Sequence, residues 1–146
     1  RLALAPYQLS EAARHAAAFL PRMAGVASIR DAFETGLRAL APDAVIFAGE
    51  SARLPNTSLF AIPGLRAATA LIAFDLDGVA VSSGSACSSG KVGRSHVLAA
   101  MGVPAEQAAA AIRVSFGDRS DKADAASVLK SLERQLVRSR NSRSAA

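Results

Sequence analysis

The chain has 146 residues, of which 51% are hydrophobic, 20% are charged and 5% are aromatic. Its 17 Lys and Arg residues against 12 Asp and Glu residues give a formal charge of +5. This length and hydrophobic content predict one folded domain with its own core and exclude a disordered chain. A small positive charge with few aromatic side chains argues against nucleic acid as a partner.

The chain holds a single cysteine, Cys87, which excludes an internal disulfide. No apolar run reaches the 18 or so residues that a membrane span needs, so we expect no membrane partner. The first six residues lack the pattern of a signal peptide, and the chain is therefore expected in the cytoplasm. The chain does not begin with Met, and this favours a fragment of a longer protein.

The first two predicted elements are helices. An alanine-rich segment from Ser10 predicts a helix that ends or kinks at Pro21. A second helix follows and stops at Pro42. Its apolar residues recur at helical spacing on one stripe: Ile29, Phe33, Leu37 and Leu40.

Two short apolar runs, 44–48 and 58–62, predict paired strands on either side of a polar loop. A third helix is expected after Pro63 and Gly64, and residues 79–81 predict a buried third strand. The expected buried face of the third helix consists of Leu65, Ala68, Leu71, Ile72 and Leu76.

Residues 82–90 have no hydrophobic side chain larger than Ala and predict an exposed, mobile loop around Cys87. Two short helices are expected next, from His96 and from Pro104. Residues 112–116 alternate apolar and polar side chains, as a half-buried strand does, and this places Arg113 opposite the core face.

The last predicted helix begins at Ser120 and Asp121 and runs to about Arg138. The order of elements predicts an α/β (α+β) domain with helices packed on a small sheet. We expect a helical N-terminal segment at 1–41, an α/β core at 42–138 with the cysteine loop, and a flexible basic tail at 139–146.

Cys87 has two interpretations from its residue type and position. A lone cysteine is most often a small buried hydrophobe without chemistry. A thiol among small residues in a loop is also accessible to a substrate, and the cations Lys91 and Arg94 nearby would favour its thiolate. The residues alone leave both interpretations open.

Arg113 has two interpretations as well. Its planar guanidinium suits bidentate binding of a carboxylate, such as that of an amino acid, but an ordinary surface ion pair explains it equally. His15 and His96 are interpreted as residues on helix surfaces and not as bases.

Three segments together resemble a known family. They are 53–57 (RLPNT), 81–90 (VSSGSACSSG) and 112–117 (IRVSFG). Their order and spacing are similar to those of cysteine desulfurases of the nitrogen-fixation and iron-sulfur-assembly type. The resemblance runs from the helix near Ile29 to the one that ends near Arg138.

The resemblance implies the small C-terminal domain of a fold-type I, pyridoxal-phosphate-dependent enzyme of the class V aminotransferase-like group. Such enzymes convert L-cysteine to L-alanine and carry the sulfur as a persulfide. Cys87 matches the nucleophile, and Arg113 matches the residue that binds the substrate carboxylate. Residues implied to support the loop or considered as further candidates are Gly84, Ser85, Ala86, Ser88, Asn56 and Lys91.

The resemblance also implies a homodimer and a protein that accepts the sulfur. The lysine and the phosphate site for pyridoxal phosphate belong, in this family, to a large domain ahead of this region. Neither is recognisable here, so we expect the large domain to be absent, no cofactor on this chain and no activity of this chain alone.

Three alternatives remain open. The chain could be a stand-alone persulfide carrier or interaction module. It could be the small domain of another class V enzyme, such as a selenocysteine lyase. It could also bind tRNA or another polyanion through its arginine-rich end.

Overall fold

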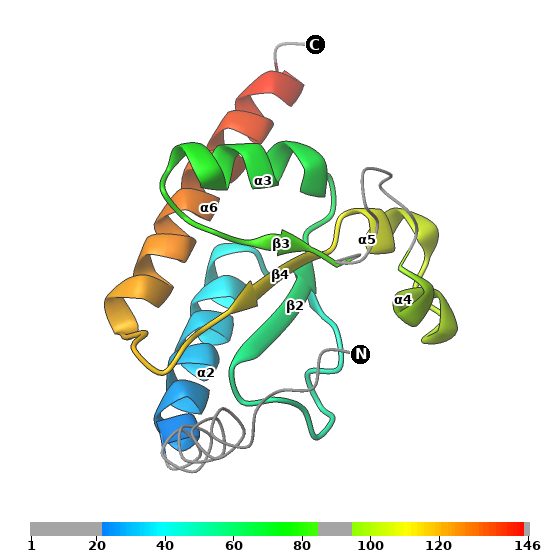
Figure 1. Cartoon of the computed structure of the whole chain (residues 1–146). Coiled ribbons are helices and arrows are strands. Elements are labelled where there is room, and N and C mark those ends of the chain that lie inside the picture. Colours follow the sequence, from blue (N-terminus) through cyan, green and yellow to red (C-terminus); the bar gives the residue numbers. More distant parts are fainter. Residues whose placement is uncertain (1–21, 85–94, 145–146) are drawn as a thin grey trace, which may run out of the picture.

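A computed structural model describes residues 22–84 and 95–144 (Figure 1). In these ranges, helices alternate with short strands that form one antiparallel sheet, in the order β1-β2-β4-β3. The elements are α2 (Met23–Leu40), β1 (Val45–Ile46), β2 (Thr57–Ala61), α3 (Ala67–Leu76), β3 (Ser82–Ser83), α4 (His96–Ala100), α5 (Ala105–Ala109), β4 (Ile112–Ser115) and α6 (Lys122–Ser144).

One face of the sheet packs against α2, α3 and α6. Helices α2 and α6 run next to each other, and α3 crosses α6 (Figure 1). Phe33 from α2 contacts Phe60 of β2 and Phe116 after β4, with ring centroids 5.7 and 5.9 Å apart. Tilted and edge-on ring pairs of this kind stabilise the fold beyond what the burial of their apolar area contributes. The main core therefore lies between the three helices and the sheet.

A second, smaller cluster of buried residues involves α4 and α5. Leu98 of α4 is fully buried together with Phe47, Ala61 and Ala111, and Leu59 of β2 packs against them. Because Leu59 lies directly opposite Arg113 in the β2–β4 pair, this cluster is on the face of the sheet that the three long helices leave open.

Several sequence predictions are confirmed. The predicted apolar stripe of α2 is buried at Ile29, Phe33 and Leu37. The alternation at β4 buries Ile112 and Val114 and leaves Arg113 on the other face. The two short helices and the antiparallel pairing of β1 with β2 are also present.

The predicted strand at 79–81 is wrong. The chain leaves α3 through Gly78, whose φ of 74° is a left-handed conformation that glycine tolerates. Only Ser82 and Ser83 then find partners on β4, opposite Arg113 and Ile112. A strand forms where a neighbouring strand offers hydrogen bonds, and apolar composition alone placed this one three residues too early. Ser82 and Ser83, which were predicted as the start of the loop at 82–90, belong to β3 instead.

The predicted buried face of α3 is only partly right: Leu65 is buried and Leu71 packs against the main core, but the rest of the face is wrong. The structure buries Ala67, Ala70 and Phe74, whereas Ile72 and Leu76 are 64% and 83% exposed. Almost every residue of this helix is apolar, so the pattern does not single out one face.

The flexible tail predicted from residue 139 is wrong in its start, because α6 continues to Ser144. Asp121 accepts hydrogen bonds from the backbone N–H groups of Ala123 and Asp124 and so caps the N-terminus of the helix. Arginines near the other end are good helix formers and favour the negative end of the helix dipole.

Some predicted features lie outside the described residues. They are the first helix with His15, and the residues Ser85, Ala86, Cys87, Ser88, Lys91 and Arg94. In the described ranges, no helix is both long and apolar enough to cross a membrane.

Candidate active-site region

Arg113 lies at the centre of the open sheet face. It is directly opposite Ser82 of β3 on one side and Leu59 of β2 on the other. Its side chain is half-buried, and within residues 22–84 and 95–144 its guanidinium has no hydrogen bond or ion pair. A guanidinium can donate two parallel hydrogen bonds to one carboxylate, and none of the described carboxylates takes this place at Arg113.

The segment that contains Cys87 follows β3, the strand that pairs with the strand of Arg113. Gly84 follows β3 directly, and its backbone N–H donates to the carbonyl oxygen of Ala111 over 2.9 Å. A Cβ atom at Gly84 would come within 2.9 Å of the Cβ of Ala111, which is closer than two such atoms pack. The glycine therefore allows the backbone to pass tightly beside β4 before the cysteine segment starts.

Asn56 and Thr57 tie the start of β2 to the end of β4. The Asn56 side-chain amide donates to the carbonyl oxygen of Phe116 over 3.3 Å, and the Phe116 N–H donates to the Asn56 carbonyl over 2.8 Å. The hydroxyls of Thr57 and Ser115 are 3.3 Å apart. These contacts give Asn56 a role in holding the two strands together, and its place among the possible site residues stays a prediction.

Arg53, the first residue of the RLPNT segment, holds the loop before β2 against α2. Its two terminal nitrogens donate to the two carboxylate oxygens of Glu34, each over 2.6 Å. Burial alone would raise the pKa of Glu34, but the hydrogen bonds and positive charge of Arg53 outweigh it and hold this pKa below its ordinary value. The same pair raises the pKa of Arg53.

Sequence reasoning missed Glu34 as the partner of Arg53. Glu34 is 4% exposed and sits beside Phe33 on the core side of α2. A carboxylate directly next to an apolar stripe was the available signal, because a buried charge requires a partner.

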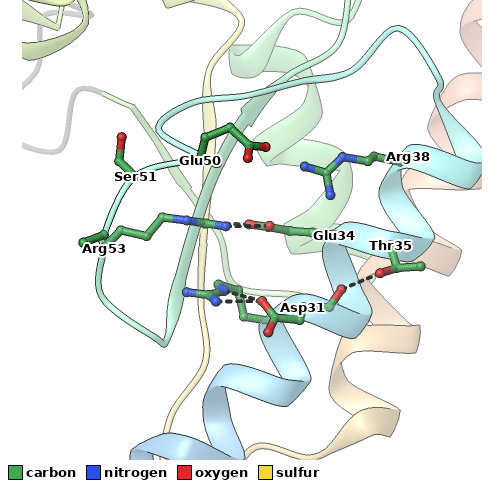
Figure 2. A pocket seen from close by; sticks show the side chains of 10 residues that line it. Asp31, Glu34, Thr35, Arg38, Glu50, Ser51 and Arg53 are labelled. Atoms are coloured by element: carbon green, nitrogen blue, oxygen red, sulfur yellow. Dashed lines mark hydrogen bonds and ion pairs between the residues drawn. The ribbon is translucent and has the colours of Figure 1, made fainter.

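The Arg53–Glu34 pair lines a pocket of about 500 Å³ between α2 and the loop before β2 (Figure 2). Figure 2 shows Arg53 of the loop and Glu34 of α2 pointing toward each other across the pocket. Glu50 of the loop and Arg38 of α2 both lie above this pair in the view. Neither Arg113 nor Gly84 lines this pocket. The pocket and the open sheet face are thus different places.

No family model matches the chain. A cysteine desulfurase from Sinorhizobium fredii is 36% identical over 118 residues, which are 81% of this chain and 30% of that protein. The cysteine desulfurase IscS from Dictyoglomus turgidum is 38% identical over 112 residues, or 77% of this chain and 28% of that protein.

Among solved structures, a NifS-like protein from Rickettsia africae superposes with a TM-score of 0.67 and is 33% identical. The chain belongs to the cysteine desulfurase family. It spans about 30% of the length of these relatives and corresponds to their C-terminal part. The mixed α/β fold predicted from the sequence is confirmed by the same comparison.

The described residues of this desulfurase-family chain do not fit pyridoxal phosphate. The two lysines within them, Lys122 and Lys130, are exposed on α6 and do not lie on the strand of Arg113. The described ranges also hold no group of side chains that could bind a metal ion. We therefore derive no catalytic step through a cofactor on these residues.

Proposed function

We propose that the chain is the part of a cysteine desulfurase that supplies the substrate-binding arginine and the nucleophilic thiol. In this proposal, L-cysteine is the substrate, Arg113 binds its α-carboxylate, and Cys87 receives its sulfur. The observation that carries the proposal is the place of Arg113: its guanidinium has no hydrogen bond or ion pair within the described residues, and its strand pairs with β3, which leads into the cysteine segment.

Arg113 suits the carboxylate for a geometric reason. It projects from the central part of β4, between β2 and β3, so the sheet fixes its backbone. A planar guanidinium held in this way can donate two parallel hydrogen bonds to one carboxylate. The hydroxyls of Thr57 and Ser115 lie on the same face of the sheet and add polar groups on the side of β4 that carries Arg113.

Chain connectivity supports the role of Cys87. Cys87 is three positions after Gly84, and three steps of extended chain span at most about 11 Å. Gly84 is itself anchored to Ala111, two residues before Arg113. The thiol can therefore reach a substrate held by Arg113 without any change in the sheet.

The proposed reaction balances without a further reagent. L-cysteine and the Cys87 thiol give L-alanine and a Cys87 persulfide. The bond between the thiolate of Cys87 and the substrate sulfur forms, while the bond between that sulfur and the β-carbon breaks. The β-carbon keeps the electron pair and takes up a proton.

Stabilising that electron pair is the work of pyridoxal phosphate, which we propose is held by the rest of the complete enzyme. The complete enzyme is proposed to be a homodimer that passes sulfur to an acceptor protein. Its proposed compartment is the cytoplasm, where thiols stay reduced. The 146 residues alone are proposed to be inactive.

The complete enzyme tests the proposal. We expect L-alanine to form from L-cysteine in the presence of pyridoxal phosphate, and Cys87→Ala to abolish it while leaving cofactor binding unchanged. The isolated 146 residues should form none. Undiminished alanine and sulfide production by Cys87→Ala would overturn the role of the thiol. Activity of the isolated chain would overturn the proposal that the rest of the complete enzyme holds the cofactor.

A further inference from the structure

The pocket between α2 and the loop before β2 has no part in the proposed reaction. Its volume of about 500 Å³ lies in the range of small-molecule sites. Most such sites are lined by apolar side chains, whereas the charged residues that line this one are Arg30, Asp31, Glu34, Arg38, Glu50 and Arg53. Three positive and three negative side chains leave the lining without net charge, and this favours a ligand that is polar but also neutral overall.

Direct contacts close two of the three pairs of opposite charge. Arg53 donates to both carboxylate oxygens of Glu34, each over 2.6 Å. Arg30 donates to Asp31 from two nitrogens, over 2.6 and 3.0 Å, and to the carbonyl oxygen of Leu54 over 3.0 Å. These bonds join the loop to α2, so these four side chains already have partners within the chain.

The third pair is open. Figure 2 shows Arg38 of α2 and Glu50 of the loop extending toward each other from the two walls of the pocket. Within residues 22–84 and 95–144, neither side chain forms a hydrogen bond or an ion pair. The guanidinium of Arg38 lies against the loop backbone, because a Cβ atom at Gly49 would be 3.7 Å from one of its terminal nitrogens. One strong donor and one strong acceptor therefore face the same space.

A free α-amino acid carries a group that complements each of these two side chains. Its carboxylate accepts two parallel hydrogen bonds from a guanidinium, and its ammonium group donates to a carboxylate. Acetate or an alkylammonium ion would satisfy only one of the two side chains and would leave the other without a partner.

We propose that this pocket is a second amino-acid site, in which Arg38 binds the carboxylate and Glu50 binds the ammonium group of a small zwitterion such as L-alanine. The site is separate from the proposed substrate site, because Arg113 does not line the pocket. Both side chains are exposed, so each contact contributes little free energy, and the dissociation constant is expected to be about 1 to 10 mM.

Chemical protection of single arginines tests the site in the complete, unaltered enzyme. Phenylglyoxal modifies accessible guanidiniums, and digestion followed by mass spectrometry gives the modification rate of each arginine. The rates are measured without additive and with L-alanine, acetate or ethylammonium, each at about 50 mM, which exceeds the expected dissociation constant. Arg66 is the matched control, because it is exposed at the start of α3 and outside the pocket. It also corrects for reagent that L-alanine consumes.

We expect L-alanine to slow the modification of Arg38 at least about fivefold relative to Arg66, and acetate and ethylammonium to slow it less than about twofold. No slowing of Arg38 relative to Arg66 would overturn the site. Equal slowing by L-alanine and acetate would also overturn it, because the ligand would then be an anion and Glu50 would have no part in binding.

Two variants separate this site from the proposed substrate site and test the second contact. Protection of Arg38 by L-alanine should persist in Arg113→Lys, and its loss there would show that L-alanine acts through Arg113 and would overturn the second site. In Glu50→Gln, protection of Arg38 by L-alanine should fall to the level seen with acetate. Glu106→Gln, an exposed position on α5, is the matched control and should keep full protection. Full protection in Glu50→Gln would contradict the zwitterion contact.

Discussion

Arg53 and Glu34 form a bidentate ion pair between the loop before β2 and the core side of α2, with both nitrogen–oxygen distances at 2.6 Å. Their side chains are 17% and 5% exposed. The pair fixes the residues that lead into β2, and β2 in turn pairs with the strand that carries Arg113.

Arg53→Ala is expected to lower the free energy of unfolding by about 3 kcal/mol, because it leaves the Glu34 carboxylate buried without its partner. Urea denaturation measures the change. Arg22→Ala is the matched control, since the Arg22–Asp118 pair is 3.4 Å long and exposed at 64% and 36%; it should cost under about 1 kcal/mol. Equal losses for the two variants would contradict the structural role given to Arg53.

The Glu34 carboxyl should make stability depend on acid pH. Its pKa in the folded chain is below the ordinary 4.5, so between these two values the unfolded chain binds more protons and stability rises with pH. The stabilisation is thus complete above about pH 4.5 and is lost as the pH falls through the lowered pKa.

Glu34→Gln should remove this contribution. Unfolding free energies measured from pH 3 to pH 7 are expected to slope less steeply at the acid end for Glu34→Gln than for the unaltered chain. Parallel curves for the two proteins would show that the pair does not lower the pKa of this carboxyl.

Gly84→Ala is expected to destabilise the chain by about 1 to 3 kcal/mol, because the new Cβ would lie 2.9 Å from Ala111 and 3.4 Å from Leu98. The shift should also displace the start of the cysteine segment and slow alanine formation in the complete enzyme. Gly25→Ala is the control: it lies in α2 with nothing within 4 Å of the added atom, and it should stabilise slightly. Thermal unfolding and the alanine assay check both effects, and a neutral Gly84→Ala would remove the close approach as a constraint.

Arg113→Lys is expected to separate stability from activity. The guanidinium has no partner in the described ranges, so the free energy of unfolding should change by less than about 0.5 kcal/mol. In the complete enzyme, the KM for L-cysteine should rise about 10- to 100-fold, because lysine cannot make the bidentate contact.

Arg119→Lys, an exposed position after β4, is the matched control and should leave both quantities unchanged. An unaltered KM in Arg113→Lys would exclude carboxylate binding by Arg113.

Sequence patterns predicted correctly those helices and strands whose apolar residues repeat at one spacing and so form a single apolar face. The stripe of α2 around Phe33 and the alternation around Arg113 each have a single apolar face, and the structure buries that face. Ile72 and Leu76 were assigned to the core because α3 offers two equivalent apolar faces, and only the position of α6 and the sheet decides between them.

The features that depend on partners far along the chain could not be predicted locally. Glu34 and Arg53 are 19 residues apart, and nothing in the sequence around either residue indicates that the other is its partner. Only part of the site could be predicted and then checked. Arg113 lies on the face of β4 that the strand pattern predicts. Cys87 lies outside the described residues, and its role stays a prediction.

The most direct measurement follows the sulfur itself. The complete enzyme is incubated with L-cysteine and pyridoxal phosphate, quenched with an alkylating reagent and digested, and the peptide containing residues 82–90 is weighed by mass spectrometry. We predict that this peptide gains one sulfur atom on Cys87, that reductant removes it, and that Arg113→Lys lowers its yield at limiting L-cysteine. An active enzyme whose Cys87 peptide never gains sulfur would contradict the account.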